Sequence, residues 1–276
     1  MSDGKIISIV NHKGGVLKTT TTANLGAALA RRGKRVLVCD LDPQQNLTES
    51  LVGKNPYDEG DRTLFDAMMD EEGFDHLIQS TSTKGLDILP SSEDFFYTDL
   101  SLAPKEAREF VLKSCFAKTK RLAEYDHVII DNSPSVSLVT VNALAASDYF
   151  LVPISAEYLP LTGLVMLGNS IGRIQEKLAP GLAALGVLIT LYHRNENICR
   201  EVERALQSEL GDMLFRTRIR VNTKAKTAPS VRQTIFQFEG SPRGRGTEDY
   251  TRLAEEFLER LEGKTQDQGR RVVANG

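Results

Sequence analysis

Short apolar segments alternate with helix-length segments along most of this 276-residue chain. The segments are apolar throughout, as expected for parallel strands that helices cover on both faces. The expected strands are residues 6–10, 35–40, 127–131, 149–154 and 185–190. The expected helices are residues 19–32, 104–121, 137–146, 161–178, 197–210 and 247–262. This alternation predicts an α/β fold with a doubly wound, mostly parallel sheet flanked by helices on both faces.

Neither a repeat nor a low-complexity linker divides the sequence, so a single domain over residues 1–262 is the simplest interpretation. Residues 51–85 are weakly patterned and predict short elements and loops, whereas the polar residues 263–276 predict a disordered tail. The 3 cysteines stand far apart, which argues against a disulfide framework or zinc site and favours the reducing cytoplasm. No apolar stretch reaches the roughly 18 to 20 residues of a membrane span, so no membrane location is expected.

A glycine-containing loop follows the first expected strand and leads directly into a helix, with the sequence NHKGGVLKTT at residues 11–20. Such a loop points backbone N–H groups at a phosphate chain, and the helix N-terminus adds partial positive charge. Gly14 and Gly15 allow the phosphates to approach the backbone closely. Lys18 would bridge the β- and γ-phosphates, and the Thr19 hydroxyl would ligate Mg²⁺. The alternative is an ordinary glycine-rich turn, which Lys-Thr-Thr at the helix start disfavours.

The loop departs from the general pattern G-x-x-x-x-G-K-[ST], because His12 and Leu17 stand at its two glycine positions. It fits the deviant form K-G-G-x-x-K-[ST], with a second lysine, Lys13, near its start. Here the sequence resembles the ParA/MinD family of ATPases, and its ParA/Soj branch in particular. Further blocks fit that family in order, namely RVLVCDLDPQQN at 35–46, VIIDNSP at 128–134, ASDYFLVP at 146–153, APS at 228–230 and RGRG at 243–246.

The resemblance implies an ATP site and a homodimer. In the family, the lysine that matches Lys13 reaches the nucleotide of the other subunit, so ATP lies between two chains. Nucleotide contacts are implied for Lys13, Gly14, Gly15, Val16, Leu17, Lys18, Thr19 and Thr20, and for Asn222 at the adenine. Leu17 stands where most relatives carry glycine; we expect ATP binding to persist, with the hydrolysis rate left open.

Aspartates at the ends of expected strands complete the implied site. By resemblance, Asp42 orients or deprotonates the attacking water, and Lys13, Lys18 and Asp42 form the catalytic set. Thr19, Asp40 and Asp131 are the implied residues around Mg²⁺ and its water shell. A strand-terminal aspartate can also cap a helix or turn, which is the structural alternative. The expected cofactors are therefore ATP and Mg²⁺, and the expected activity is a slow ATPase stimulated by DNA and a partner.

The net charge of −3 is unevenly distributed. No acidic residue occurs between Asp212 and Glu239, although this stretch contains Arg216, Arg218, Arg220, Lys224, Lys226 and Arg232. Such a stretch can form a positive surface, unless carboxylates from elsewhere in the fold neutralise it. Relatives bind DNA non-specifically through this region and through an arginine that matches Arg194. The implied DNA contacts are Arg194, Arg216, Arg218, Arg220, Lys224, Lys226 and Arg243.

Taken together, the resemblance implies a cytoplasmic ATPase switch that is nucleoid-associated when it holds ATP. A ParB-like or other adaptor would stimulate hydrolysis, and the switch would segregate or position a plasmid, a chromosome or a protein assembly. One alternative is a MinD-like membrane-associated regulator of division-site placement. That class needs a C-terminal amphipathic helix with a basic polar face, whereas the last expected helix carries Glu255, Glu256, Glu259 and Glu262. Another alternative is a weakly hydrolysing, ATP-bound scaffold in which Leu17 has disabled turnover.

Overall fold

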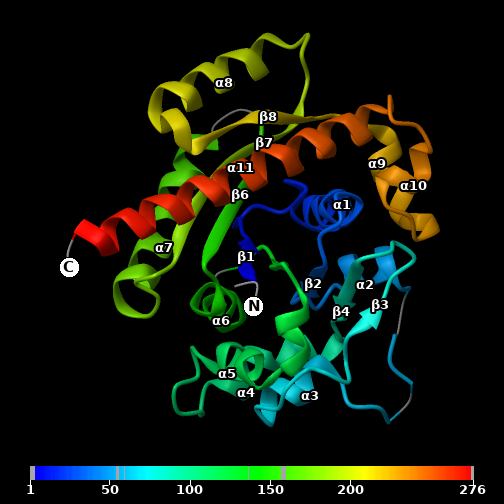
Figure 1. The fold of residues 1–276 in the computed structure, drawn as a ribbon, viewed down its shortest axis with the longest axis vertical. Coiled ribbons are helices and arrows are strands. Elements are labelled where there is room, and N and C mark those ends of the chain that lie inside the picture. The colour runs from blue at the N-terminus through cyan, green and yellow to red at the C-terminus, as the bar shows by residue number, and fades with distance from the viewer. Residues whose placement is uncertain (1–3, 54–55, 59, 136, 157–159, 275–276) are drawn as a thin grey trace.

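A computed structural model describes residues 4–53, 56–58, 60–135, 137–156 and 160–274 (Figure 1). The strands are β1 Lys5–Ile9, β2 Val36–Asp40, β3 Gln79–Ser80, β4 Leu86–Leu89, β5 His127–Asp131, β6 Tyr149–Ser155, β7 Ala183–Tyr192 and β8 Leu214–Arg220. They form one sheet in the order β3-β4-β2-β5-β1-β6-β7-β8. Within the described residues, β3 runs antiparallel to β4 and the other neighbouring strands are parallel. The predicted fold class is confirmed.

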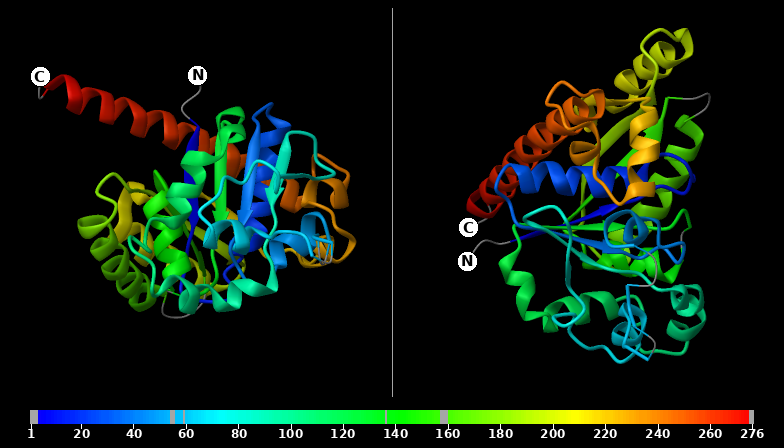
Figure 2. Two further views of the ribbon diagram at one scale, coloured as in Figure 1. Left: turned by 90° about the horizontal axis from the view of Figure 1, so that it is seen from below. Right: turned by 90° about the vertical axis from the view of Figure 1, so that its right-hand side faces the viewer.

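Helices cover both faces of this sheet, as the views in Figure 2 show. The helices are α1 Lys18–Arg31, α2 Asn46–Leu51, α3 Leu64–Met69, α4 Thr98–Leu102, α5 Val111–Lys118, α6 Leu138–Ala146, α7 Pro160–Lys177, α8 Asn197–Leu210, α9 Thr223–Thr227, α10 Ile235–Glu239 and α11 Arg245–Ala274. Helices α1, α10 and α11 pack on one face, and α3, α5, α6, α7 and α8 pack on the other.

Alternate residues of the central strands supply the two halves of the core. In β2, Val36 and Val38 join the apolar cluster under α1 and α11, whereas Leu37 and Cys39 join the cluster under α3 and α5. All four are fully buried. Because successive side chains of a strand point to opposite faces, a strand covered on both faces must be apolar throughout. This explains why the central strands were predictable from apolar runs.

The structure differs from the sequence predictions in several elements, among them the strand β4, which was not predicted. Residues 104–121 were expected to form one helix, but α5 begins only at Val111, because Ala107 adopts a positive φ of 48° that a right-handed helix cannot contain. The strand β8 was not predicted, since its arginines hide the apolar pattern of Phe215 and Ile219. Helix α11 continues beyond residue 262, where a disordered tail was predicted. Extending an existing helix adds one backbone hydrogen bond per residue without a new nucleation step.

The last helix is attached to β8 through one buried carboxylate. Glu256 of α11 is 4% exposed and accepts hydrogen bonds from the N–H groups of Arg216 and Thr217 at 2.7 and 2.8 Å. It also accepts a charge-assisted bond from Arg260 at 3.0 Å. Burial alone raises the pKa of Glu256, but these hydrogen bonds outweigh it and hold the pKa below its ordinary value. The ionised carboxylate therefore holds α11 on the sheet.

We predict that Glu256→Ala lowers the free energy of unfolding at pH 7 by about 3 kcal/mol, because it leaves two strand N–H groups without their acceptor and removes the carboxylate partner of Arg260. The matched control is Glu259→Ala, one turn further along the same helix, where the carboxylate is 62% exposed and pairs with Arg216. That change should cost less than about 1 kcal/mol. Urea unfolding measures both, and equal losses would contradict the role given to Glu256.

Candidate functional site

The predicted phosphate loop lies at the carboxyl edge of the sheet, where the strand order reverses. β1 lies between β5 and β6, with β2 beyond β5 on one side and β7 beyond β6 on the other. Doubly wound sheets bind their ligands at such a reversal point, outside the carboxyl ends of the strands. The fold therefore places the loop between β1 and α1 at the ligand-binding position of this architecture.

Two residues with positive φ shape the loop. Gly15 has φ +74°, and Leu17 has φ 63° and ψ 33°, in the left-handed region that favours glycine. Leu17 is the N-cap of α1, and its carbonyl oxygen accepts a hydrogen bond from the Thr21 N–H at 2.8 Å. The Thr190 hydroxyl of β7 donates to the Val16 carbonyl oxygen at 3.1 Å. The backbone thus keeps the turn of a phosphate loop with leucine at a glycine position.

Lys18 lies folded back over this loop. Its ammonium group donates to the carbonyl oxygen of Lys13 at 3.2 Å, and the residue is 7% exposed. Burial lowers the pKa of Lys18, whereas the carboxylates of Asp131 and Asp42 act in the opposite direction. A cation held in this position faces the space that the phosphates of a nucleotide would fill. Lys13 itself is exposed.

Asp40 and Asp131 lie side by side, because the register of β2 and β5 places them opposite each other. Both side chains are fully buried. Burial raises the pKa of Asp40 to about 6, although hydrogen bonds from Thr48 oppose the shift. Burial and the neighbouring Asp40 raise the pKa of Asp131 well above its ordinary value, while the Thr19 hydroxyl opposes this. Two adjacent buried carboxylates favour a bound cation.

The residues present here fit Mg²⁺, which takes oxygen ligands and retains several water molecules. Asp131 Oδ2 is buried and has no hydrogen-bond partner among the described residues. Thr19 interacts with this carboxylate and also lines the cavity above it. The structure therefore brings Thr19, Asp40 and Asp131 together, with Thr19 and Asp131 the better placed to hold a metal ion and its water molecules.

Asp40 also accepts hydrogen bonds that fix the conformation of the segment after β2. Oδ1 accepts from the Asp42 N–H at 3.0 Å, and Oδ2 accepts from the N–H and hydroxyl of Thr48 at 2.9 and 2.7 Å. The Thr48 hydroxyl accepts from the Ser91 N–H, and the Ser91 hydroxyl donates to the Asp42 carbonyl oxygen, both at 2.9 Å. This closed network fixes the position of Asp42.

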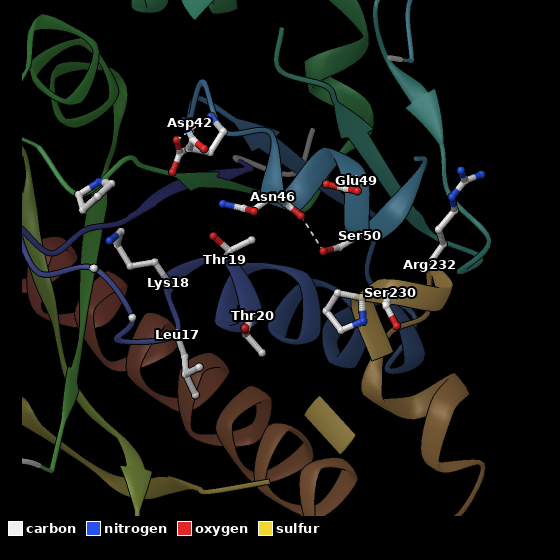
Figure 3. Close-up of a pocket in the computed structure, with 15 residues that line it drawn as sticks. Leu17, Lys18, Thr19, Thr20, Asp42, Asn46, Glu49, Ser50, Ser230 and Arg232 are labelled. Atoms are coloured by element: carbon white, nitrogen blue, oxygen red, sulfur yellow. Dashed lines mark hydrogen bonds between the residues drawn. The ribbon is translucent and has the colours of Figure 1, made fainter. Parts of the chain in front are cut away.

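A cavity of about 670 Å³ opens above the loop, between α1 and α2 (Figure 3). Of the predicted site residues, Gly14, Gly15, Leu17, Lys18, Thr19, Thr20 and Asp42 line it. Sequence reasoning missed Asn46, Glu49 and Ser50, which also line it. Their spacing of i, i+3 and i+4 places them on one face of α2, and this periodicity after Asp42 was the available signal. Arg232, which was noted only as a cation of the basic stretch, lines the cavity from the C-terminal region.

The cavity of about 670 Å³ above the loop is here called the phosphate cavity. A smaller cavity of about 230 Å³, here called the side cavity, lies next to it. Leu17, Thr20 and Pro229 line both. Asn222, the predicted adenine contact, lines the side cavity. Its amide is committed within the protein, because Oδ1 accepts from the Lys224 N–H at 2.9 Å and Nδ2 donates to Glu239 at 3.0 Å. The adenine contact stays a prediction.

Three arginines of the predicted basic surface are neutralised within the fold. The ion pairs are Arg216 with Glu256 and Glu259, Arg218 with Glu203, and Arg220 with Glu248 and Asp249. The carboxylates come from α8 and α11, which the local sequence around β8 does not reveal. Arg194, Lys224, Lys226 and Arg243 are exposed, and no ion pair within the described part of the chain involves them.

We predict that Asp131→Asn stabilises the metal-free protein at pH 8, because the neutral amide removes the cost of holding an ionised carboxylate buried beside Asp40. Because the pKa of Asp131 is raised in the fold, stability falls as the pH rises from the ordinary aspartate pKa toward the raised one, and the loss is complete above it. Below the ordinary aspartate pKa the carboxyl is protonated in both the folded and the unfolded protein, and the gain disappears.

The control is Asp249→Asn, which changes an aspartate that is also buried but pairs with Arg220 at 2.6 Å. This change should destabilise, because it removes one of the two carboxylates that pair with Arg220 and the charged acceptor of the Arg220 N–H, although burial raises the pKa of Asp249 as well. Urea unfolding in EDTA at several pH values gives both free energies. A loss of stability for Asp131→Asn at pH 8 would contradict the repulsion inferred between the two carboxylates.

Comparison with known proteins agrees with this geometry. A family profile described as an AAA domain matches residues 4–184. The chain is 38% identical to the sporulation initiation inhibitor protein Soj of Bacillus subtilis, over 92% of this chain and 98% of that protein. It is 37% identical to the chromosome-partitioning ATPase Soj of Thermus thermophilus, over 93% of this chain and 96% of that protein.

A solved structure also matches nearly the whole chain. The cobyrinic acid a,c-diamide synthase of Mycobacterium smegmatis, solved with bound ADP and magnesium, has a TM-score of 0.79 and 29% sequence identity. The match covers 94% of this chain and 96% of that one. The extent of these similarities confirms the family expected from the phosphate loop. The chain belongs to this AAA-domain family and, within it, to the ParA/MinD group of P-loop ATPases.

Proposed function

We propose that this protein is a Mg²⁺-dependent ATPase of the ParA type, which dimerises on ATP and positions a cargo on DNA. The observation that carries the proposal is the cavity lined by the phosphate loop, Lys18 and Asp42, with the buried Asp40–Asp131 pair in contact with its lining residue Thr19. The Soj relatives, of which one is a chromosome-partitioning ATPase, and the ADP and magnesium of the solved structure support it.

We assign each residue of the site a role in binding or hydrolysing ATP. The loop N–H groups and Lys18 bind the phosphates, and Thr19 with Asp131 holds Mg²⁺, which neutralises charge on the β- and γ-phosphates. Asp42 is 7% exposed, lines the phosphate cavity and accepts the Gln44 N–H at 2.9 Å, so its carboxylate is already oriented. It orients or deprotonates the attacking water. Slow turnover, stimulated by DNA and an adaptor, is part of the proposal.

Dimerisation rests on Lys13, which precedes the two glycines of the loop and is exposed. A lysine there can reach a nucleotide bound by a second copy, and its charge lowers the repulsion between two triphosphates brought together. ATP then holds the dimer, and hydrolysis releases it.

We predict that Asp42→Ala slows hydrolysis about 100-fold or more, because general-base catalysis contributes at least that much. The protein should still bind Mg·ATP and remain a dimer for as long as ATP is present. Light scattering after gel filtration measures the mass, and phosphate release measures turnover. Lys18→Ala is the control, since it should lose ATP binding and stay monomeric. An Asp42→Ala protein that binds ATP but remains monomeric would refute the switch.

DNA binding is proposed for the exposed cations at the carboxyl edge, namely Arg194, Lys224, Lys226 and Arg243. Arg194 follows β7, Lys224 and Lys226 follow β8, and Arg243 precedes α11. A dimer would present two such sets. A substitution of Arg220 would not test this surface, because its guanidinium forms ion pairs with Asp249 and Glu248 inside the fold. Contacts to phosphates alone would make binding independent of base sequence and strongly dependent on salt.

We predict that Lys224→Ala with Lys226→Ala weakens binding to random duplex DNA in the presence of ATP. The slope of log K against log salt should fall by about 2, roughly one for each DNA phosphate that the variant no longer neutralises. Fluorescence anisotropy over a salt series measures the slope. Lys84→Ala with Lys113→Ala removes the same charge from exposed residues elsewhere and should leave it unchanged. Equal slopes for both double variants would exclude the proposed surface.

We propose a DNA-bound, nucleoid-associated state rather than a membrane-bound one. Within the described residues no helix is long and apolar enough to span a membrane. A MinD-like anchor needs an apolar helix face available to lipid. The apolar residues Tyr250, Leu253 and Phe257 of α11 are instead fully buried against the sheet. An adaptor of the ParB kind would complete the cycle by stimulating hydrolysis.

A further inference from the structure

We propose that Leu17 determines how this protein recognises the base of its nucleotide, by forming an apolar wall of the side cavity. This inference rests on the proposed binding of ATP. It assigns to the side chain of a phosphate-loop residue a contact with the base, in addition to the contacts that the loop backbone makes with the phosphates.

The backbone conformation of Leu17 directs its side chain away from the phosphates. With φ 63° and ψ 33°, the residue lies in the left-handed region at the start of α1. Figure 3 shows the Leu17 side chain pointing to the opposite side of the loop from Lys18 and Thr19. The side chain is partly buried and packs against the core cluster of α1 and α11. It therefore leaves the phosphate side open while filling space on the other side.

The side cavity is placed and sized for part of a nucleotide. Its volume of about 230 Å³ is smaller than cavities that hold a whole drug-sized ligand, which measure about 300 to 1,000 Å³. It shares Leu17, Thr20 and Pro229 with the phosphate cavity. A ligand whose phosphates lie on the loop can thus extend past Thr20 and place a flat group between Leu17 and Pro229.

The walls of the side cavity are mainly apolar, with Leu17, Leu191, Ile219, Ala225 and Pro229 among the lining residues. Two polar side chains that line it are already bonded inside the protein. The Arg220 guanidinium bonds Asp249 at 2.8 Å, and the Asn222 amide bonds Glu239 at 3.0 Å. Thr20, Lys226 and Tyr250 also line the cavity and supply its further polar groups. Leu17 contributes apolar contact and shape to recognition of a base, through a branched side chain that glycine lacks.

The test compares Mg·ATP with Mg·tripolyphosphate, which has the phosphates but no base. Dissociation constants for both are measured by calorimetry on the wild type, Leu17→Gly and Leu17→Met. Leu17→Gly should weaken ATP about ten-fold, the effect of roughly two buried methyl groups, and leave tripolyphosphate within about two-fold. Leu17→Met keeps an apolar side chain and should stay within about three-fold for both ligands.

A second variant changes another residue that lines the same cavity. Ala225→Leu should weaken ATP and leave tripolyphosphate unchanged, because the added methyl groups occupy the space for the base. Unaltered ATP binding in both Leu17→Gly and Ala225→Leu overturns the inference, as does an equal loss of both ligands in Leu17→Gly, which would assign Leu17 to the phosphates. A wild type that binds neither ligand refutes the proposed ATP site itself, and so is distinguishable from failure of this inference.

Discussion

The pair of buried aspartates at the ends of β2 and β5 constrains the site more than any other contact. Asp40 and Asp131 are adjacent because of strand register, and both are fully buried. Placing two carboxylates there is unfavourable unless donors and cations surround them. Lys18, the Thr19 hydroxyl and the hydrogen bonds from Thr48 supply that environment. The same repulsion that destabilises the empty protein favours binding of Mg²⁺ with a nucleotide.

The sequence was most informative where one local pattern determines both structure and chemistry. The apolar run of β5 ends at Asp131, and the loop from Lys13 to Thr19 joins a strand to a helix, so the positions of these residues could be predicted, while their roles stay predictions. It was least informative for charge. The carboxylates that neutralise β8 lie on α8 and α11, 15 to 43 residues from the arginines they bind. Only the pairing of elements in space reveals which cations remain exposed.

The contribution of α2 shows a second limit of sequence reasoning. Residues 35–46 identified Asp42, but not that Glu49 and Ser50 face the same cavity. That depends on where α2 begins and on the Asp40–Thr48–Ser91 network that turns the helix toward the loop. The network joins residues up to 51 positions apart in the chain, between Asp40 and Ser91. The spacing of Asn46, Glu49 and Ser50 indicates that they share one face of a helix, but only this long-range arrangement determines that the face lines the cavity.

The C-terminal third of the chain completes the site through contacts with its beginning. The side-chain amide oxygen of Asn24 in α1 accepts the Ile235 N–H at 2.7 Å, which holds α10 beside α1. The Arg232 guanidinium lies against Gly53, just after α2, and an added Cβ there would come within 2.6 Å of it. Pro229 precedes both of these C-terminal residues in sequence and lines both cavities. Since the walls around a nucleotide come from both ends of the chain, a bound nucleotide would also stabilise the packing of α10 and α11.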